Sequence, residues 1–214
     1  MKNFLTSIIL AVICSGCATT EITSFVDPDY RDKVYKVSTL LVRATGTTLQ
    51  ETLAFENALE EKTKKYGIQI IKFTDLVPPT RSASPEEIAS IIKKTKANSI
   101  LTLSIISRDE IIKNVPVTYH PGTTTSYVST VGGISTVNTR TSGGYTTGGY
   151  STSDPVLHSL FLLTDISTGM NIWKAEAKSS SEGGYSHLEL MFNAVESALG
   201  DMSKHGYLME SPQK

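Results

Sequence analysis

Three copies of a helix-start motif constrain the fold of this chain more than any other feature of its sequence. They read TLQE at 48–51, SPEE at 84–87 and SHLE at 186–189. In such a capping box the Ser or Thr hydroxyl accepts a hydrogen bond from the third helical amide, and the Glu carboxylate accepts one from the capping amide. Apolar residues follow each motif at helical spacing, and Gly67 and Gly206 offer ends for the first and third helices. The sequence therefore predicts three helices that begin at these motifs.

Apolar segments alternate with the first two of these helices. Residues 34–44, 68–73 and 99–106 are rich in Val, Ile and Leu, which is typical of strands buried in a sheet. The resulting order is strand, helix, strand, helix, strand, with short connections between them. Such an order favours right-handed crossovers and parallel strands. We therefore expect a βαβαβ unit in the first half of the chain.

The second half is expected to add a hairpin and a closing helix. Residues 156–179 read as two strands joined at Ser167-Thr168-Gly169, and residues 109–119 can extend the sheet. A chain of 214 residues is long enough to bury one sizeable core. The prediction is an α/β fold: a βαβαβ unit, a β-hairpin pair and a closing C-terminal helix, with helices covering the sheet. It places one domain at 34–207 and a tail at 208–214.

The amino-terminal segment has the layout of an export signal. Lys2 precedes about ten mostly apolar residues, which are too few to span a bilayer, and Ser15-Gly16-Cys17 follows. Ser15-Gly16 directly before a cysteine resembles the lipobox of bacterial lipoproteins, although Cys14 stands where Leu is usual. The resemblance implies cleavage before Cys17 and acylation of that residue, so residues 1–16 would be the signal peptide. A plain signal peptide, and a redox or zinc role for Cys14 and Cys17, are the alternatives.

The same resemblance implies a location. Ala18 is not the Asp that retains lipoproteins at the inner membrane of Gram-negative cells, so an outer-membrane anchor with the domain facing the periplasm is expected. A surface-exposed orientation stays open. Residues 17–33 are polar and contain proline, and we expect them to form a lipidated tether. The lipid bilayer is then the first expected partner, through Cys17.

Residues 121–153 form an insertion of unusual composition, because 23 of its 33 residues are Gly, Ser or Thr. Such a segment buries little apolar surface, which favours a flexible loop. The alternatives are a β-ribbon that becomes ordered on a partner or another copy, and a membrane-spanning ribbon, which the lack of apolar and polar alternation disfavours. Tyr127, Tyr145 and Tyr150 are the candidate interaction residues of this insertion.

Motifs for chemistry are missing from the sequence. It contains no phosphate-binding loop, no His-Glu-x-x-His and no Gly-x-Ser-x-Gly, and its four histidines are scattered. Asp165 precedes a turn and is expected to hold turn amides rather than to act in catalysis. Twenty basic and twenty-one acidic residues provide no basic surplus for nucleic acid. We therefore expect no catalytic residue, no metal and no cofactor.

One further pattern carries a family resemblance. Asp165, Thr168, Gly169 and Trp173 match the Asp-x-x-Thr-Gly turn and following Trp strand of a broad group of bacterial envelope lipoproteins. That group is similar in fold to the periplasmic part of the curli secretion channel lipoprotein, to the Pel export lipoprotein and to the amino-terminal domain of the Tol propeller protein. The resemblance implies a non-enzymatic role with envelope proteins or with itself, as in ring-like or export assemblies. The alternative function is a periplasmic ligand-binding module or a hydrolase of envelope glycan.

Overall fold

The computed structural model describes residues 18–31, 33–131, 134–182 and 184–209. Cys14 and Cys17 lie outside these residues, so the predictions about them are not addressed by the fold. The chain divides into two compact units, one built from residues up to Glu110 together with those from Pro155 onward, and a second formed by Ile111–Asp154. Each unit is described by itself below.

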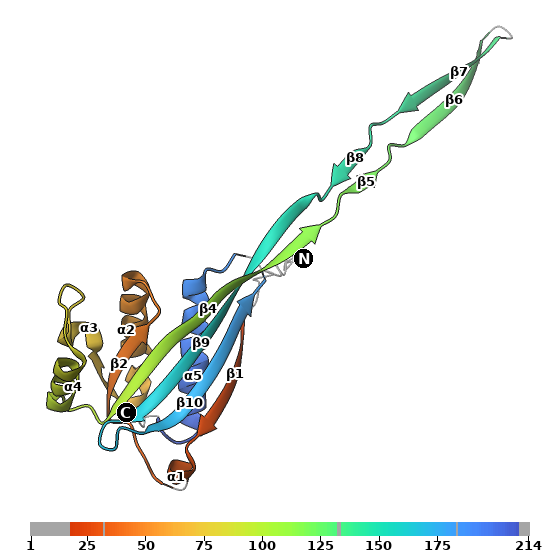
Figure 1. The fold of residues 1–214 in the computed structure, drawn as a ribbon. Coiled ribbons are helices and arrows are strands. Elements are labelled where there is room, and N and C mark those ends of the chain that lie inside the picture. Colours follow the sequence, from red (N-terminus) through yellow and green to blue (C-terminus); the bar gives the residue numbers. More distant parts are fainter. Residues whose placement is uncertain (1–17, 32, 132–133, 183, 210–214) are drawn as a thin grey trace, which may run out of the picture. The chain divides into compact units, whose positions relative to one another are not determined.

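The first unit is a six-stranded sheet covered by helices (Figure 1), in the order β1-β10-β9-β4-β2-β3. β2 pairs in parallel with both β3 and β4, whereas β10 pairs antiparallel with β1 and β9. The α/β class is therefore confirmed. The elements are β1 Ala18–Val26, α1 Pro28–Arg31, β2 Thr39–Thr45, α2 Leu49–Thr63, η1 Lys64–Tyr66, β3 Gln69–Lys72, α3 Phe73–Leu76, α4 Pro85–Lys94, β4 Ser99–Val115, β9 Tyr150–Asp165, β10 Asn171–Ser181 and α5 His187–Lys204.

All three predicted capping boxes are present and open α2, α4 and α5. At the start of α2, for example, Thr48 N donates to Glu51 Oε2 at 2.7 Å, and Glu51 N donates to Thr48 Oγ1 at 3.2 Å. Gly67 ends the first helical segment in a left-handed conformation, with φ 66°, after the 3-10 turn η1. The helix starts follow from contacts within four residues, and for that reason the sequence alone could locate them.

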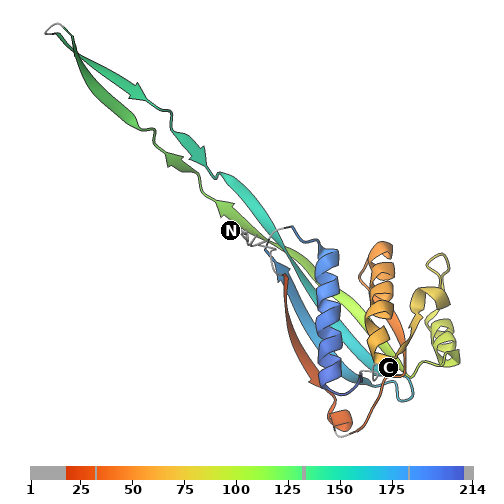
Figure 2. The ribbon, with the colours of Figure 1, turned by 180° about the vertical axis from the view of Figure 1, so that it is seen from behind.

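The hydrophobic core lies between the sheet and the two long helices. Figure 2 shows α2 and α5 side by side on one face of the sheet. Phe55 of α2, Phe161 of β9 and Trp173 of β10 are almost completely buried there. Trp173 Nε1 donates to Asp201 Oδ2 of α5 at 2.9 Å, which satisfies the one polar atom of the indole. Trp173 thereby packs the β9–β10 hairpin on the core.

The expected tether is wrong for residues 18–26, which form edge strand β1. β1 pairs antiparallel with β10 along its whole length, from Ala18 opposite Ser181 to Val26 opposite Trp173. Its inward positions include Thr20 as well as Ile22 and Val26, and Thr20 Oγ1 lies 2.8 Å from Ser179 Oγ. Because polar residues occupy part of the inward row, the alternation was hidden in a Thr- and Ser-rich sequence. The pairing with β10 supplies the order that composition does not indicate.

Candidate interaction surfaces

The second unit, Ile111–Asp154, forms a two-stranded antiparallel ribbon. β5 Thr118–His120 pairs with β8 Tyr145–Thr147, and β6 Thr124–Val131 pairs with β7 Ile134–Thr141. Three residues separate the two paired stretches on each strand, so the register does not change between them. Inside this gap Ser142 N donates to Thr123 O at 3.0 Å. The inserted residues therefore form paired strands, which follow one another in Figure 1, and ordering of the ribbon by a partner or another copy stays a prediction.

Glycines allow the two strands of this ribbon to approach each other closely. A Cβ added at Gly122 would overlap Ser142 O, and one at Gly148 would overlap Pro116 O. Gly148 also has a φ of 84°, which a residue with a Cβ rarely adopts. The sequence interpretation favoured a flexible loop because this segment buries little apolar surface. In the structure these two glycines are instead required by contacts across the ribbon.

The ribbon exposes aromatic and β-branched side chains but carries few charges. Tyr145 stacks on His120, with ring centroids 4.5 Å apart. The charged residues of this unit are Arg140 and the ion pair Lys113–Asp154, whose Nζ and Oδ2 atoms lie 2.8 Å apart. The candidate interaction residues Tyr127, Tyr145 and Tyr150 are all exposed, and so is Tyr119, which the sequence analysis did not name. Exposed fractions lie between 56% and 67% for Val117, Tyr119, Tyr127, Val128, Val137, Tyr145 and Tyr150.

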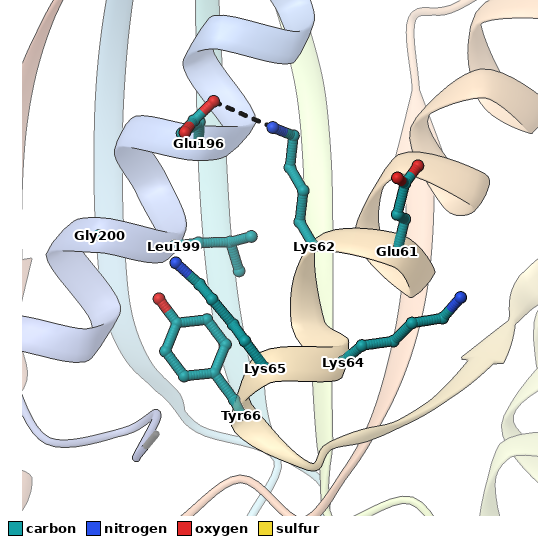
Figure 3. Close-up of a pocket in the computed structure, with 8 residues that line it drawn as sticks. All are labelled: Glu61, Lys62, Lys64, Lys65, Tyr66, Glu196, Leu199 and Gly200. Carbon is teal, nitrogen blue, oxygen red and sulfur yellow. Dashed lines mark hydrogen bonds and ion pairs between the residues drawn. The ribbon is translucent and has the colours of Figure 1, made fainter. Parts of the chain in front are cut away.

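A groove of about 570 Å³ lies on the first unit between the end of α2 with η1 and helix α5. Figure 3 shows Lys65 extended beside the ring of Tyr66 and Lys62 reaching Glu196. Lys62 Nζ lies 2.9 Å from Glu196 Oε2, and Lys65 Nζ lies 4.9 Å from the Tyr66 ring centroid. Lys62 and Lys65 therefore already have partners. The groove has the character of a surface recess rather than of a catalytic centre.

A buried carboxylate with a raised pKa would favour an enzyme, and Glu56 has these properties. Burial raises the pKa of Glu56, more than its hydrogen bonds from Thr74 lower it. Its oxygens accept hydrogen bonds from Thr74 N, at 3.2 Å, and from Thr74 Oγ1. Glu56 thus holds the first turn of α3, and it lines none of three pockets of about 570, 450 and 350 Å³ found among the described residues. We interpret its role as structural.

Asp165 holds a turn, as predicted. Its Oδ1 accepts hydrogen bonds from Ser167 N at 2.9 Å and Ser167 Oγ at 2.7 Å, and its Oδ2 accepts one from Tyr30 Oη at 2.8 Å. Burial by itself would raise the pKa of Asp165, but the hydrogen bonds from Ser167 and Tyr30 outweigh it, and the pKa is lowered. The carboxylate therefore stays charged and ties α1 to the β9–β10 hairpin.

Ser24, His205 and Asp201 lie together, yet they are not arranged as a nucleophilic triad. Ser24 Oγ and Asp201 Oδ2 both lie 3.5 Å from the same ring atom, His205 Nε2. A catalytic triad needs the serine and the carboxylate on opposite nitrogens of the imidazole, so that one nitrogen is held while the other takes the proton. The same Asp201 oxygen also accepts the Trp173 hydrogen bond. These contacts anchor the end of α5.

The scattered histidines form no metal site in the described part of the chain. His158 Nε2 lies 4.0 Å from Asp109 Oδ2, and His187 Nε2 lies 3.4 Å from the Asp109 carbonyl oxygen, so the fold brings these two histidines to one residue. No group of three or more potential metal ligands is present among the residues that the structure describes. Over the same residues, no helix combines the length and apolar character needed to cross a membrane.

Comparison with known proteins finds remote similarity only among solved structures. No protein-family model matches the sequence, and no curated protein matches it. The PelC dodecamer from Paraburkholderia phytofirmans is similar at 11% identity over 90% of this chain and 100% of that chain, with a TM-score of 0.45. Lipoprotein GNA1162 from Neisseria meningitidis is similar at 9% identity over 77% of this chain and 99% of that chain, with a TM-score of 0.39.

Proposed function

We propose that this protein is a lipid-anchored protein of the bacterial cell envelope that binds other envelope proteins or further copies of itself and has no enzymatic activity. The observation that carries the binding role is the exposed ribbon of the second unit, with its tyrosines and few charges. The lipobox-like Ser15-Gly16-Cys17 supports the anchor. The structural roles of Glu56, Asp165 and His205 support a role other than catalysis.

Acylation of Cys17 would make the membrane attachment effectively permanent. Each buried methylene contributes about 0.8 kcal/mol, so one chain binds marginally and two or three bind stably. Since β1 begins at Ala18, the lipid would be attached directly to the edge strand of the sheet without a spacer. The first unit would then lie against the membrane surface. Ala18 in place of Asp favours the outer membrane, with the protein on its periplasmic side.

The anchor is tested by replacing Cys17 with Ser and expressing the full chain in a Gram-negative host with an alkyne-tagged palmitate. The wild-type protein should become labelled and sediment with the outer membrane. Cys17→Ser should lose the label and either leave the membrane fraction or accumulate uncleaved. Cys14→Ser is the matched control and should behave as wild type. An unlabelled wild-type protein, or unchanged membrane association of Cys17→Ser, would contradict the proposal.

The binding role is tested in the same host by in-cell crosslinking through Tyr127, Tyr145 and Tyr150, each replaced one at a time by a photoreactive phenylalanine. The proposal expects discrete crosslinked species from these positions. The control position is Phe25, an exposed aromatic residue of the first unit. Ribbon positions that give no more crosslinked product than Phe25 would contradict the assignment of binding to the ribbon.

A further inference from the structure

The alternation of hydrogen bonds in the ribbon shows which backbone groups have no partner within it. Ser142 N donates to Thr123 O, so these two residues form a hydrogen-bonded pair. In an antiparallel ladder such pairs alternate with pairs whose N–H and C=O groups point outward. With the observed register, the backbone N–H and C=O groups of the pairs Thr125–Arg140 and Tyr127–Asn138 point toward the opposite strand of the ribbon. The residues whose backbone N–H and C=O groups point away from the ribbon are Thr124, Ser126 and Val128 on β6 and Val137, Thr139 and Thr141 on β7.

Both edges of the ribbon therefore present unpaired donors and acceptors. β6 and β7 form a sheet of their own, with a single partner for each strand among the described residues. Proteins usually protect such edges with lysines, prolines, bulges or a covering element. β6 and β7 contain no proline, their one charge is Arg140, and their register is regular. A two-stranded ribbon in water is also only marginally stable, and a third strand stabilises it.

We propose that the edge formed by β6 or β7 pairs, backbone to backbone, with a β6 or β7 edge in the ribbon of a second copy of this chain. This inference rests on the proposed function and names the partner of the ribbon. Each strand adds to the edge of the next, so the ribbons of neighbouring copies form a wider sheet. Tyr127 and Val128 of β6, or Val137 of β7, then pack against side chains of the neighbouring copy across the new strand pair.

The composition of the ribbon favours a second copy over a different protein. Thr124 Oγ1 and Thr141 Oγ1 lie 3.3 Å apart, and Ser126 Oγ and Thr139 Oγ1 lie 3.2 Å apart, so hydroxyl pairs already run across the ribbon. An identical neighbouring strand can continue these hydroxyl rows. Like charges directly opposite each other destabilise strand pairs. Arg140 is the one charged residue of β6 and β7, so two paired copies have only this residue to keep apart. Anchoring in one membrane would also raise the effective concentration of the copies for each other.

Residue-resolved amide hydrogen exchange on the detergent-solubilised full chain tests this pairing directly. At low concentration the outward amides of Ser126, Val128, Val137 and Thr139 should exchange fast, and the inward amides of Thr125 and Tyr127 slowly. On concentration, the outward amides of at least one strand should slow by tenfold or more. Association with all outward amides still exchanging fast would place the contact on another surface and overturn the proposal, as would a chain that stays monomeric.

Charged residues at the ribbon edge provide the second test. Ser126→Lys and Thr139→Lys are made one at a time, because the two residues lie opposite each other in the ribbon, and each places a positive charge on one strand. At least one of them should reduce self-association, measured by light scattering, by tenfold or more. Thr23→Lys, on the exposed face of β1, is the control and should leave it unchanged. Unchanged association of both variants would overturn the proposal. Outward amides that slow only when other envelope proteins are added would overturn it in favour of a heterologous partner. None of these measurements depends on acylation, so the anchor can be correct even if the pairing is not.

Discussion

Replacement of Asp165 by Asn tests how the β9–β10 hairpin is tied to α1. Asp165 is 5% exposed and accepts three hydrogen bonds, from Tyr30 Oη and from the amide and hydroxyl of Ser167. Asn can keep its carbonyl oxygen facing Ser167, but it presents an amide group to Tyr30. The Tyr30 bond to a charged acceptor, worth about 1.5–3 kcal/mol, is replaced by a weaker neutral bond in which the Asn amide donates to Tyr30 Oη, and the two Ser167 bonds weaken to neutral strength. We expect a loss of about 2–4 kcal/mol in the free energy of unfolding.

The assay is urea unfolding followed by the fluorescence of Trp173, the single tryptophan, which lies in the same core. For a chain of this size 1 kcal/mol shifts the thermal midpoint by roughly 2–4 °C. Tyr30→Phe removes the donating hydroxyl alone and should cost about 1–3 kcal/mol. Because the two residues are in contact, the double variant should lose less than the sum of the single variants.

The dependence on pH provides a second measurement of the same contact. The pKa of Asp165 is lowered in the folded state, so its stabilisation is complete above the unfolded value of about 3.9 and is lost as the pH falls through the folded value. The difference between wild type and Asp165→Asn should therefore be constant near neutrality and shrink below about pH 4. A difference under about 0.5 kcal/mol at pH 7, within the range of ordinary surface changes, would refute the reasoning.

Three further predictions concern other parts of the chain. Ser186→Ala should lower the free energy of unfolding by about 1 kcal/mol, because the cap opens a helix with seven buried residues. Ser84→Ala should cost less in the same urea titration, because α4 has no buried residue, and equal losses would contradict this argument. Glu56→Gln should cause little loss in the free energy of unfolding at pH 7. At acid pH the variant should be less stable relative to wild type, since the Glu56 carboxyl has a raised pKa and wild type gains stability as that carboxyl takes up its proton. A large loss in the free energy of unfolding at pH 7 would show that Glu56 is needed in its charged form. In the last variant Gly-Gly replaces residues 120–145 and joins Tyr119 to Thr146, a pair whose backbone N–H and C=O groups point toward each other. The thermal midpoint of the first unit should stay within a few degrees of wild type. Aggregation of this variant would show that the ribbon supports the core.

Much of the first unit could be predicted because its signals are local. The capping boxes join residues three apart, and the Asp165 turn joins residues within the hairpin, so neither depends on the rest of the fold. For the candidate surfaces, the sequence named Tyr127, Tyr145 and Tyr150 of the insertion as candidate interaction residues, and all three are exposed in the structure. Tyr119 was missed because it lies just outside the Gly-, Ser- and Thr-rich segment.

What the sequence alone determined is therefore the set of helix starts, the parallel βαβαβ order, the hairpin and its turn. Tertiary structure decided the two remaining features, edge strand β1 and the ribbon. Thr20 meets Ser179 across 159 residues of chain, and this pairing orders β1 although its inward row is partly polar. In the ribbon, the register between β6 and β7 turned a Gly-, Ser- and Thr-rich segment into paired strands with open edges. Both features depend on backbone hydrogen bonds to a distant strand, which any side chain permits and composition therefore does not reveal.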